Sequence, residues 1–390
     1  MNKEYRLYAR EAMEQSVKSG ELAGVSAVVF HRGEEALFHA CGEQDMENHV
    51  PLMRDTIFRL FSMTKPMTAA AAMIHVQRGQ LDVFAPVSRY LDGFAHQRVA
   101  TAMGATPVRQ QATIKDILNM TSGLVYPGEG SPAEKEMRFL FAQVKRRLEN
   151  DQPTSTVDFA NLIGRQPLAF HPGESWQYGT SSDVLGAVIE KVSGMSFGMF
   201  LKRELFEPLQ MTDTGFHVPG EKQKRFSRLY QMKDGKLQVF PHNHLGLNDY
   251  LSAPAFESGG AGLVSTIDDA LRFCRMLLGR GQLEGKRILS EAAVDFMTHN
   301  QLSDLQRQGF LWDSLRGCGY SCYMRVMEQP SQSPTFGSAG EYGWDGWTGT
   351  YFTVDPAHEM ILVVMMQKTD AGTTELVRKL RNIVYSGLEA

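Results

Sequence analysis

The stretch Phe61-Ser62-Met63-Thr64-Lys65, followed by the apolar run Met67–Val76, is the most informative part of this chain. It predicts a buried helix that begins near a serine and carries a lysine three residues later. Residues i and i+3 share one helix face, so the Ser62 hydroxyl and the Lys65 amine are expected to meet. A serine hydroxyl becomes nucleophilic when a base takes its proton, and a lysine in apolar surroundings can be that base. The tetrapeptide alone is also typical of a solvated helix start. Other segments of the chain must therefore indicate whether Ser62 is catalytic.

The bulk composition indicates a soluble globular protein. The 390 residues are 43% hydrophobic with a formal net charge of −4, enough for one large or two moderate domains. The mixed charge argues against nucleic acid as a partner, since such binders carry a basic patch. The longest apolar run, near Met360–Met366, is too short to span a membrane. The N-terminus is charged and has no apolar signal region, so we expect a cytoplasmic protein.

The cysteine and histidine spacing predicts neither a disulfide framework nor a metal site. Only Cys318 and Cys322 are near neighbours, in a strand-like run where we expect them to pack as small apolar residues. His242-Asn243-His244 has no acidic or cysteine partner at ligand spacing, so we interpret it as a solvated loop. We therefore expect no metal and no cofactor.

Strand patterns lie at both ends of the chain, with helical patterns between them. The strand-like runs are Val25–Phe30, Ala36–Cys41, Tyr320–Val326, Thr350–Val354 and Ile361–Met366. This layout predicts an α/β (α+β) fold in which one sheet is built from both chain ends and flanked by helices. Residues 1–80 and 250–390 would form a discontinuous α/β domain, and residues 81–249 a mostly helical inserted domain. A ligand cleft would lie between them.

Two further segments complete a three-part pattern with Ser62-x-x-Lys65. One contains Tyr178-Gly179-Thr180 before a predicted helix, and the other contains Trp344-Asp345-Gly346-Trp347 before a strand. In this order they resemble the boxes of the serine β-lactamase and penicillin-binding-protein superfamily, which are Ser-x-x-Lys, Tyr-x-Asn and Lys-Thr-Gly. Four further segments also resemble sequences typical of this superfamily: Thr56–Arg59, Leu118–Leu124, Gly259–Thr266 and Gly281–Gly285. Within the class C-like branch, the chain is most similar to the family VIII carboxylesterases.

This resemblance implies a β-lactamase/transpeptidase-like fold with an antiparallel sheet, and a role for each matching residue. Ser62 would be the acylated nucleophile. Lys65 and Tyr178 would share its deprotonation, with the phenol pKa lowered by the nearby ammonium, and which of them is the general base stays open. The backbone N–H groups of Ser62 and Trp347 would form the oxyanion hole. Gly346 would let the backbone approach an acyl group.

Two departures from the family pattern bear on the substrate. Thr180 stands where the second box has Asn, and Trp344 stands where the third box has Lys or His. In β-lactamases and D,D-peptidases that cation helps to hold a substrate carboxylate, whereas an indole has one N–H and no charge. The family VIII esterases typically have Trp-x-Gly at this position. Losing a charge-assisted hydrogen bond costs about 1.5–3 kcal/mol. We take Trp344, Gly346 and Thr180 as candidate substrate-binding residues, for a neutral acyl ester rather than an anionic β-lactam.

The sequence therefore predicts a serine hydrolase that cleaves short-chain carboxylic esters of a small metabolite through an acyl-enzyme on Ser62. The alternatives are a β-lactamase, a D-aminopeptidase or D,D-peptidase-type amide hydrolase, an acyltransferase, or a scaffold protein that has lost turnover. The expected partner is a small-molecule ester or amide, with neither nucleic acid nor a membrane involved.

Two other features receive no catalytic role. Gly194-Met195-Ser196-Phe197-Gly198 matches the Gly-x-Ser-x-Gly nucleophile pattern, but that turn needs a strand before it. Here a predicted helix precedes it, so we interpret the segment as a turn between helices. Asp345 is expected to be a surface or turn residue.

Overall fold

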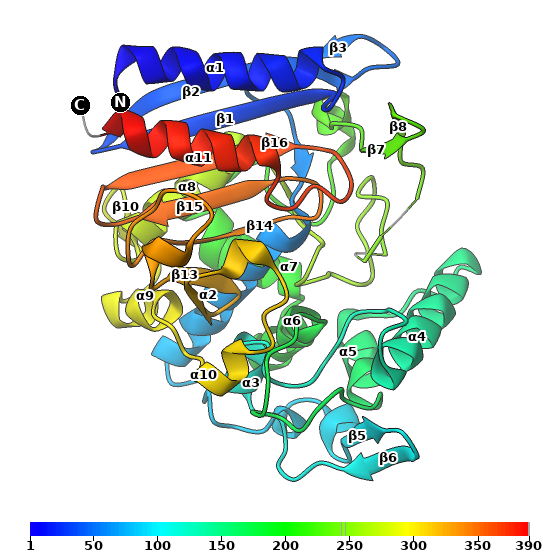
Figure 1. The fold of residues 1–390 in the computed structure, drawn as a ribbon. Helices are drawn as coiled ribbons and strands as arrows, with labels where there is room; N and C mark the ends of the chain where they lie inside the picture. The colour runs from blue at the N-terminus through cyan, green and yellow to red at the C-terminus, as the bar shows by residue number, and fades with distance from the viewer. Residues whose placement is uncertain (243, 246, 389–390) are drawn as a thin grey trace.

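The computed structural model describes residues 1–242, 244–245 and 247–388, and an eight-stranded antiparallel sheet lies at its centre (Figure 1). The strand order is β12-β13-β14-β15-β16-β1-β2-β3. β1 (Gly24–His31) pairs with β2 (Glu34–Asp45) on one side and with β16 (Met360–Met366) on the other. The N-terminal hairpin is thus completed by C-terminal strands, as the sequence predicts. The other strands of this sheet are β3 (Val50–Pro51), β12 (Cys318–Ser321), β13 (Met324–Met327), β14 (Tyr342–Asp345) and β15 (Tyr351–Asp355).

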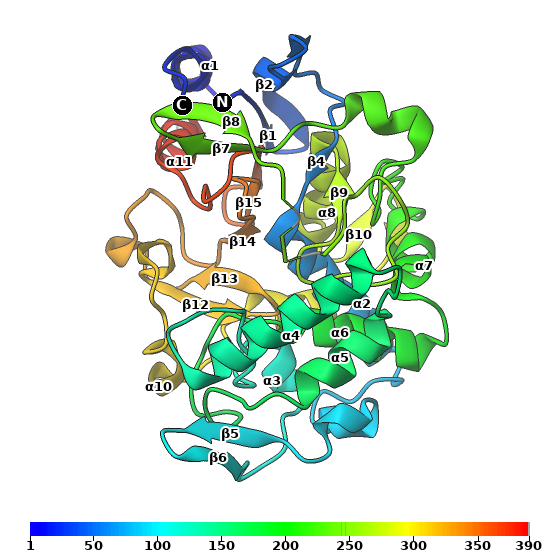
Figure 2. The same ribbon diagram turned by 90° about the vertical axis from the view of Figure 1, so that its right-hand side faces the viewer.

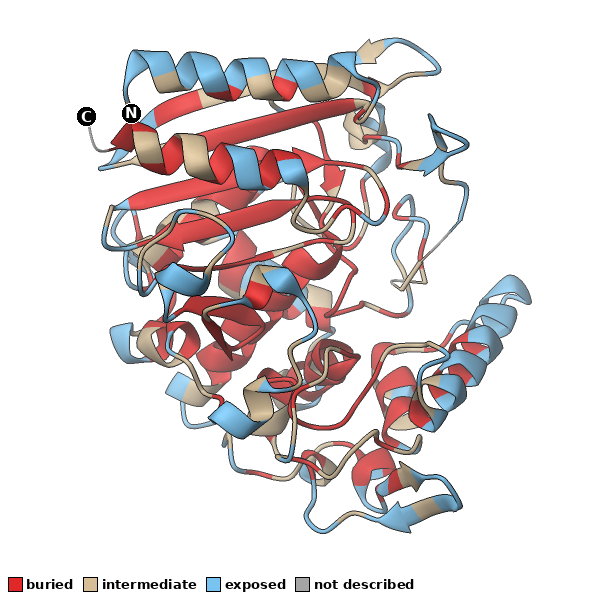
Figure 3. Ribbon diagram, in the orientation of Figure 1, coloured by how far each residue is buried: buried red, intermediate tan, exposed pale blue. Residues whose placement is uncertain are grey.

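Helices cover both faces of the sheet, and β16 shows how one strand serves both layers. Its side chains alternate between two apolar clusters, as the period of two in a strand requires. Met360, Leu362, Val364 and Met366 pack towards α1 (Lys3–Lys18) and α11 (Glu375–Leu388), whereas Ile361, Val363 and Met365 join the cluster of α8 (Ile267–Leu278). All seven residues are buried, in agreement with the continuous red of the central strands in Figure 3.

The buried helix expected after Ser62 is α2 (Thr64–Gln77). Every residue from Thr64 to His75 is buried. The helix packs against α6 (Ser181–Ser193) and α9 (Glu291–Thr298). Because it is surrounded on all sides, it needs no polar face.

The middle of the chain is mostly helical; residues 98–193 lie below the sheet, whereas residues 230–239 lie near α11 (Figures 1 and 2). Its elements are α3 (Ile114–Leu118), α4 (Pro132–Glu149), α5 (Thr156–Gly164), α6, α7 (Phe197–Leu201) and the hairpins β5 (Arg98–Thr101)–β6 (Gly104–Pro107) and β7 (Tyr230–Lys233)–β8 (Lys236–Val239). One apolar cluster contains residues both of this helical region and of the region that forms the sheet. The domain boundaries at residues 81 and 249 therefore stay a prediction. Short elements complete the fold: β4 (Phe58–Arg59), β9 (Val264–Ser265), β10 (Gln282–Leu283), β11 (Lys286–Arg287) and α10 (Asp304–Arg307).

The Gly-x-Ser-x-Gly segment joins two helices, as predicted. Gly194 caps the end of α6 in the left-handed conformation, with φ of 69°, and Ser196 caps the start of α7. Within the described residues, no single helix has the length and apolar character to cross a membrane, although Ser181–Ser193 and Phe197–Phe206 pass by length and composition as a pair bent by 77°.

The single strand predicted over Tyr320–Val326 is wrong. The structure has a hairpin there, because Cys322 and Tyr323 adopt φ of 47° and 66° and reverse the chain between β12 and β13. Two-residue hairpin turns with positive φ usually contain Gly or Asn, and neither is present. Cys322 therefore lies in a turn, although it and Cys318 are both buried.

Candidate active site

Ser62 lies in η1 (Phe61–Met63), a single turn of 3-10 helix that leads directly into α2. The preceding residue, Phe61, has a φ of 45°, a region in which a bulky side chain is strained. Neighbouring segments hold this backbone: Leu60 N–H donates to Leu263 O at 2.9 Å, and Thr350 Oγ1 donates to Leu60 O at 2.9 Å. Strain of this kind persists only where surrounding contacts fix it, and it is common at active sites.

Lys65 is fully buried, and its amine lies beside the serine. Nζ is 3.0 Å from Ser62 Oγ and donates to Gly260 O at 2.7 Å. Burial lowers the pKa of Lys65 to about 7, and the nearby carboxylates of Asp183 and Asp345 offset only part of that shift. Near neutral pH the amine is therefore available to accept a proton.

Asp183 fixes the carbonyl that holds Lys65. Its Oδ1 accepts from Ser258 Oγ at 2.6 Å and from Gly260 N–H at 2.9 Å. The carboxyl is buried, and that burial raises its pKa. Sequence reasoning missed Asp183, because its partner segment lies 75 residues further along the chain.

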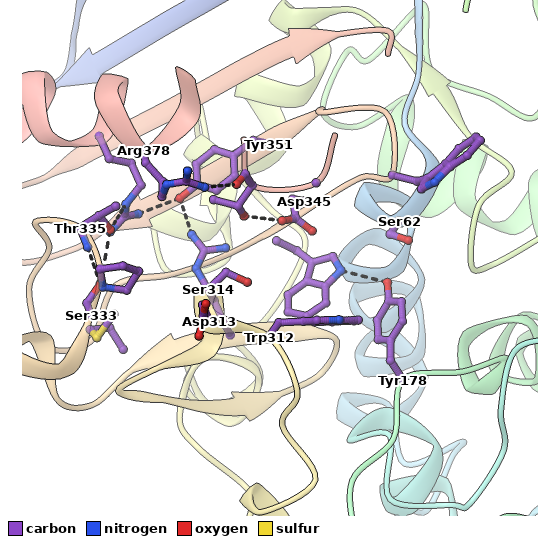
Figure 4. Close-up of a pocket in the computed structure, with 18 of the residues that line it drawn as sticks. Ser62, Tyr178, Trp312, Asp313, Ser314, Ser333, Thr335, Asp345, Tyr351 and Arg378 are labelled. Carbon is purple, nitrogen blue, oxygen red and sulfur yellow. Dashed lines mark hydrogen bonds between the residues drawn. The ribbon is translucent and has the colours of Figure 1, made fainter. Parts of the chain in front are cut away.

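Tyr178 faces the same site and accepts a hydrogen bond from Trp344 Nε1 at 3.1 Å (Figure 4). Lys65 Nζ lies 4.7 Å from the centroid of the Tyr178 ring. Four aromatic rings surround the phenol with centroids 5.1–6.2 Å away: Tyr126, Trp176, Trp312 and Trp344. They make the surroundings of the phenol largely apolar, although Tyr178 itself is only partly buried.

The expected lowering of the Tyr178 pKa is wrong. Burial raises the pKa of this phenol, and hydrogen bonds with Ser62 and Trp344 lower it by less. Desolvation disfavours the phenolate, and a Lys65 with a pKa of about 7 supplies little positive charge to offset it. Tyr178 is therefore a neutral hydroxyl that can donate a proton.

Trp347 lies at the mouth of the site. Its indole Nε1 donates to Asp370 Oδ1 at 2.8 Å, and its ring stacks on His244 with the centroids 3.9 Å apart. His244 is thus packed against the site rather than free in a solvated loop, and Asn243 lies outside the described residues. No group of three metal-binding side chains occurs in the part of the chain that the structure describes.

Two candidate substrate-binding residues do not line the cavity that contains Ser62. Thr180 is fully buried and lies directly before α6. Gly346 lies in the β14–β15 turn, packed on the backbone that precedes η1. A Cβ there would lie 2.2 Å from Thr350 Oγ1 and 2.4 Å from Leu60 O. Its lack of a side chain thus allows the turn to pack beside Ser62.

These residues surround a cavity of about 690 Å³. Ser62, Tyr178, Trp344 and Trp347 line it, together with Tyr126, Trp312 and Asp345, which sequence reasoning missed or set aside. Asp345 is partly buried at the end of β14, where the turn begins, and it accepts a hydrogen bond from Thr373 and lines the cavity, which the expectation of a surface or turn residue did not include. Its place after Trp344 in the third segment is a signal that could have included it.

Comparisons with known proteins identify the family and support the fold of this chain. The family model described as Beta-lactamase matches residues 9–384. This chain belongs to the β-lactamase family. It is 32% identical to Protein Rv1367c of Mycobacterium tuberculosis over 90% of this chain and 86% of that protein, and 31% identical to Esterase EstB of Burkholderia gladioli over 96% and 93%. The solved structure of EstCE1, described as a hydrolase with promiscuous acyltransferase activity, has a TM-score of 0.83 at 25% identity and covers 98% of this chain and 99% of its own.

Membership of the β-lactamase family confirms the resemblance and the fold class that the three segments predict. The protein is a serine hydrolase of the β-lactamase-like superfamily, with esterase-like relatives.

Proposed function

We propose that this β-lactamase family member is a serine carboxylesterase for short-chain esters that carry no anionic group beside the scissile bond. The observation that carries this proposal is the bond from Trp344 Nε1 to Tyr178 OH. Where the third box of β-lactamases and D,D-peptidases has Lys or His, this chain has an indole whose only donor is already used inside the site. Trp344 therefore provides no cation that could bind a carboxylate next to the reacting carbonyl.

In the proposed first half-reaction, neutral Lys65 takes the proton of Ser62 as Oγ attacks the ester carbonyl. The backbone N–H groups of Ser62 and Trp347 donate to the oxygen that becomes negative. Tyr178 gives its proton to the departing alkoxide and regains one from the Lys65 ammonium. The raised phenol pKa favours this donor role.

In the second half-reaction, water replaces the alcohol. The oxygen of the water attacks the acyl carbon on Ser62. At the same time the water gives a proton to Tyr178, and Tyr178 passes its own proton to neutral Lys65. The tetrahedral intermediate then releases the carboxylic acid, and the proton returns to Ser62 Oγ. The relatives described as an esterase and as a hydrolase support this assignment at the level of reaction class.

The test is a substrate panel of p-nitrophenyl esters, nitrocefin and D-Ala-D-Ala peptides, measured with wild type, Ser62→Ala and Trp344→Lys. We expect burst kinetics with the esters that Ser62→Ala abolishes, and weak nitrocefin turnover that Trp344→Lys increases. Equal ester hydrolysis by wild type and Ser62→Ala would exclude the acyl-enzyme. Nitrocefin turnover close to that of the best ester would identify a β-lactamase, and an absence of all turnover would favour a scaffold.

A further inference from the structure

The cavity that contains Ser62 has a second, polar end that the proposed chemistry does not use. In Figure 4, Ser62 and Tyr178 lie at one end of the cavity. Tyr351 and Arg378 lie at the other, close to α11. A substrate that fills this cavity therefore extends well beyond the reacting ester.

Two arginines meet at the hydroxyl of Tyr351 in this polar end. Arg381 Nη1 donates to Tyr351 OH at 2.7 Å, and Arg325 Nη2 donates to the same oxygen. Arg381 also forms an ion pair with Glu341 at 2.6 Å, with only 3% and 1% of the two side chains exposed. The charge of Arg381 is thus balanced inside the protein.

Arg325 has no such counterion. It is 7% exposed and lines the cavity, yet no carboxylate of the described residues lies within 4.0 Å of its guanidinium. Its guanidinium carbon lies 5.0 Å from the centroid of the Tyr351 ring. A cation–π contact of this kind stabilises a buried charge only in part. On β14 its neighbour is Gly343, which has no side chain to cover it. Buried charges are normally paired, so an anionic group of a ligand is the expected partner of Arg325.

The acidic residues of the cavity do not supply that anion. Asp313 pairs with Arg316 at 2.8 Å, and Glu341 pairs with Arg381. Asp345 accepts from Thr373; burial raises its pKa, and the more distant charge of Arg325 offsets only part of that rise. Because Asp345 lies outside ion-pair distance of Arg325, the remaining guanidinium N–H groups are free for a ligand.

We propose that Arg325 is a specificity-determining residue that binds a carboxylate on the substrate, at the end remote from the scissile ester. The preferred substrates are then esters that carry one carboxylate, such as monoesters of dicarboxylic acids. One unpaired guanidinium matches the single charge and planar shape of a carboxylate, which it can bind through two parallel N–H bonds. This substrate class rests on the proposed esterase function.

The chain thus has a tryptophan on β14 where the third box of β-lactamases and D,D-peptidases has a cation, and a cation one strand away on β13. This arrangement moves anion recognition away from the reacting carbonyl.

The experiment compares p-nitrophenyl butyrate with the p-nitrophenyl monoester of glutaric acid. The proteins are wild type, Arg325→Met, Arg325→Lys and the control Arg378→Met, which removes an exposed charge from the same cavity. We expect wild type to prefer the glutarate monoester. Arg325→Met should lower kcat/KM for that ester about 10- to 150-fold, through KM, and change the butyrate value less than about twofold. Arg325→Lys should retain part of the preference, and Arg378→Met nearly all of it.

Two outcomes would overturn the inference. An equal loss with both esters would give Arg325 a purely structural role through Tyr351, and no preference in wild type would remove the subsite. Free glutarate should inhibit competitively and more strongly than inorganic phosphate, and the reverse order would contradict a carboxylate site.

A binding measurement separates this inference from the proposed function. If wild type hydrolyses neither ester, the esterase proposal fails. Glutarate should still raise the Tm of Ser62→Ala and not that of Ser62→Ala combined with Arg325→Met. Equal shifts, or no shift, would then exclude the Arg325 subsite.

Discussion

Lys65 Nζ lies 3.0 Å from Ser62 Oγ, and the lysine side chain is wholly buried. The two facts belong together, because the apolar surroundings that bring the amine to the serine also disfavour its ammonium form. The packing of one helix thus places an amine with a lowered pKa beside a serine hydroxyl, as the proposed mechanism requires.

The pH dependence of the reaction tests this relationship. We expect kcat/KM for a p-nitrophenyl ester to rise with pH through about 7 and then level off, because Lys65 can accept the serine proton only when neutral. The check is a rate profile from about pH 5 to 9. Lys65→Arg, which keeps its charge throughout, should be inactive across the range. A rate that is flat or falls as pH rises towards 8 would contradict Lys65 as the base.

The same pKa shift predicts a cost in stability. Between pH 7 and the ordinary lysine value of 10.5, the unfolded chain binds a proton that the native chain does not, so stability falls as pH decreases over that interval. Lys65→Met should remove this dependence, so its stability relative to wild type should be higher at pH 7 than at pH 10, by an amount on the order of 4 kcal/mol. Urea unfolding at both pH values measures it. A difference that does not depend on pH would argue against the shift.

Tyr178→Phe tests the proton-donor role. We expect kcat to fall about 10²–10⁴-fold, as for the loss of a general acid. The change also leaves Trp344 Nε1 without its acceptor, so the free energy of unfolding should fall by about 1–3 kcal/mol. Adding Trp344→Phe should recover part of that stability and none of the kcat. A fall in kcat of less than about tenfold would remove Tyr178 from the mechanism.

Asp183→Asn tests the support of Lys65. The Asp183 charge raises the pKa of Lys65, so its removal should shift the midpoint of the rate profile to lower pH. Ser258→Ala is the matched control, because it removes a neutral partner of the same carboxylate. A midpoint unchanged in Asp183→Asn would mean that Asp183 acts only in packing.

Gly346→Ala tests the packing of the β14–β15 turn against η1. The new Cβ would lie 2.2 Å from Thr350 Oγ1, so we expect a loss of about 1–3 kcal/mol in the free energy of unfolding together with a lower kcat. Gly220→Ala is the control, because a Cβ there meets nothing within 4 Å and φ is not positive. Thermal unfolding of both variants is the measurement, and equal Tm values would contradict the packing argument.

Local patterns were enough to predict much of the fold. The apolar run after Ser62 becomes α2, and the alternation in the terminal segments becomes β1, β2, β15 and β16. The β12–β13 hairpin was missed because Cys322 and Tyr323 take positive φ without the residue types that announce such a turn. Long-range packing of the sheet, rather than local preference, imposes that conformation.

The sequence by itself determined that a serine hydroxyl and a lysine amine meet, because helix spacing sets Ser62 beside Lys65, and the order of the three segments indicates the family. The tertiary structure alone decided their chemical states. Burial from several distant segments lowers the pKa of Lys65 and raises that of Tyr178. It also leaves Arg325 without a counterion. Desolvation and charge pairing depend on neighbours in space, and spacing along the chain does not specify those neighbours.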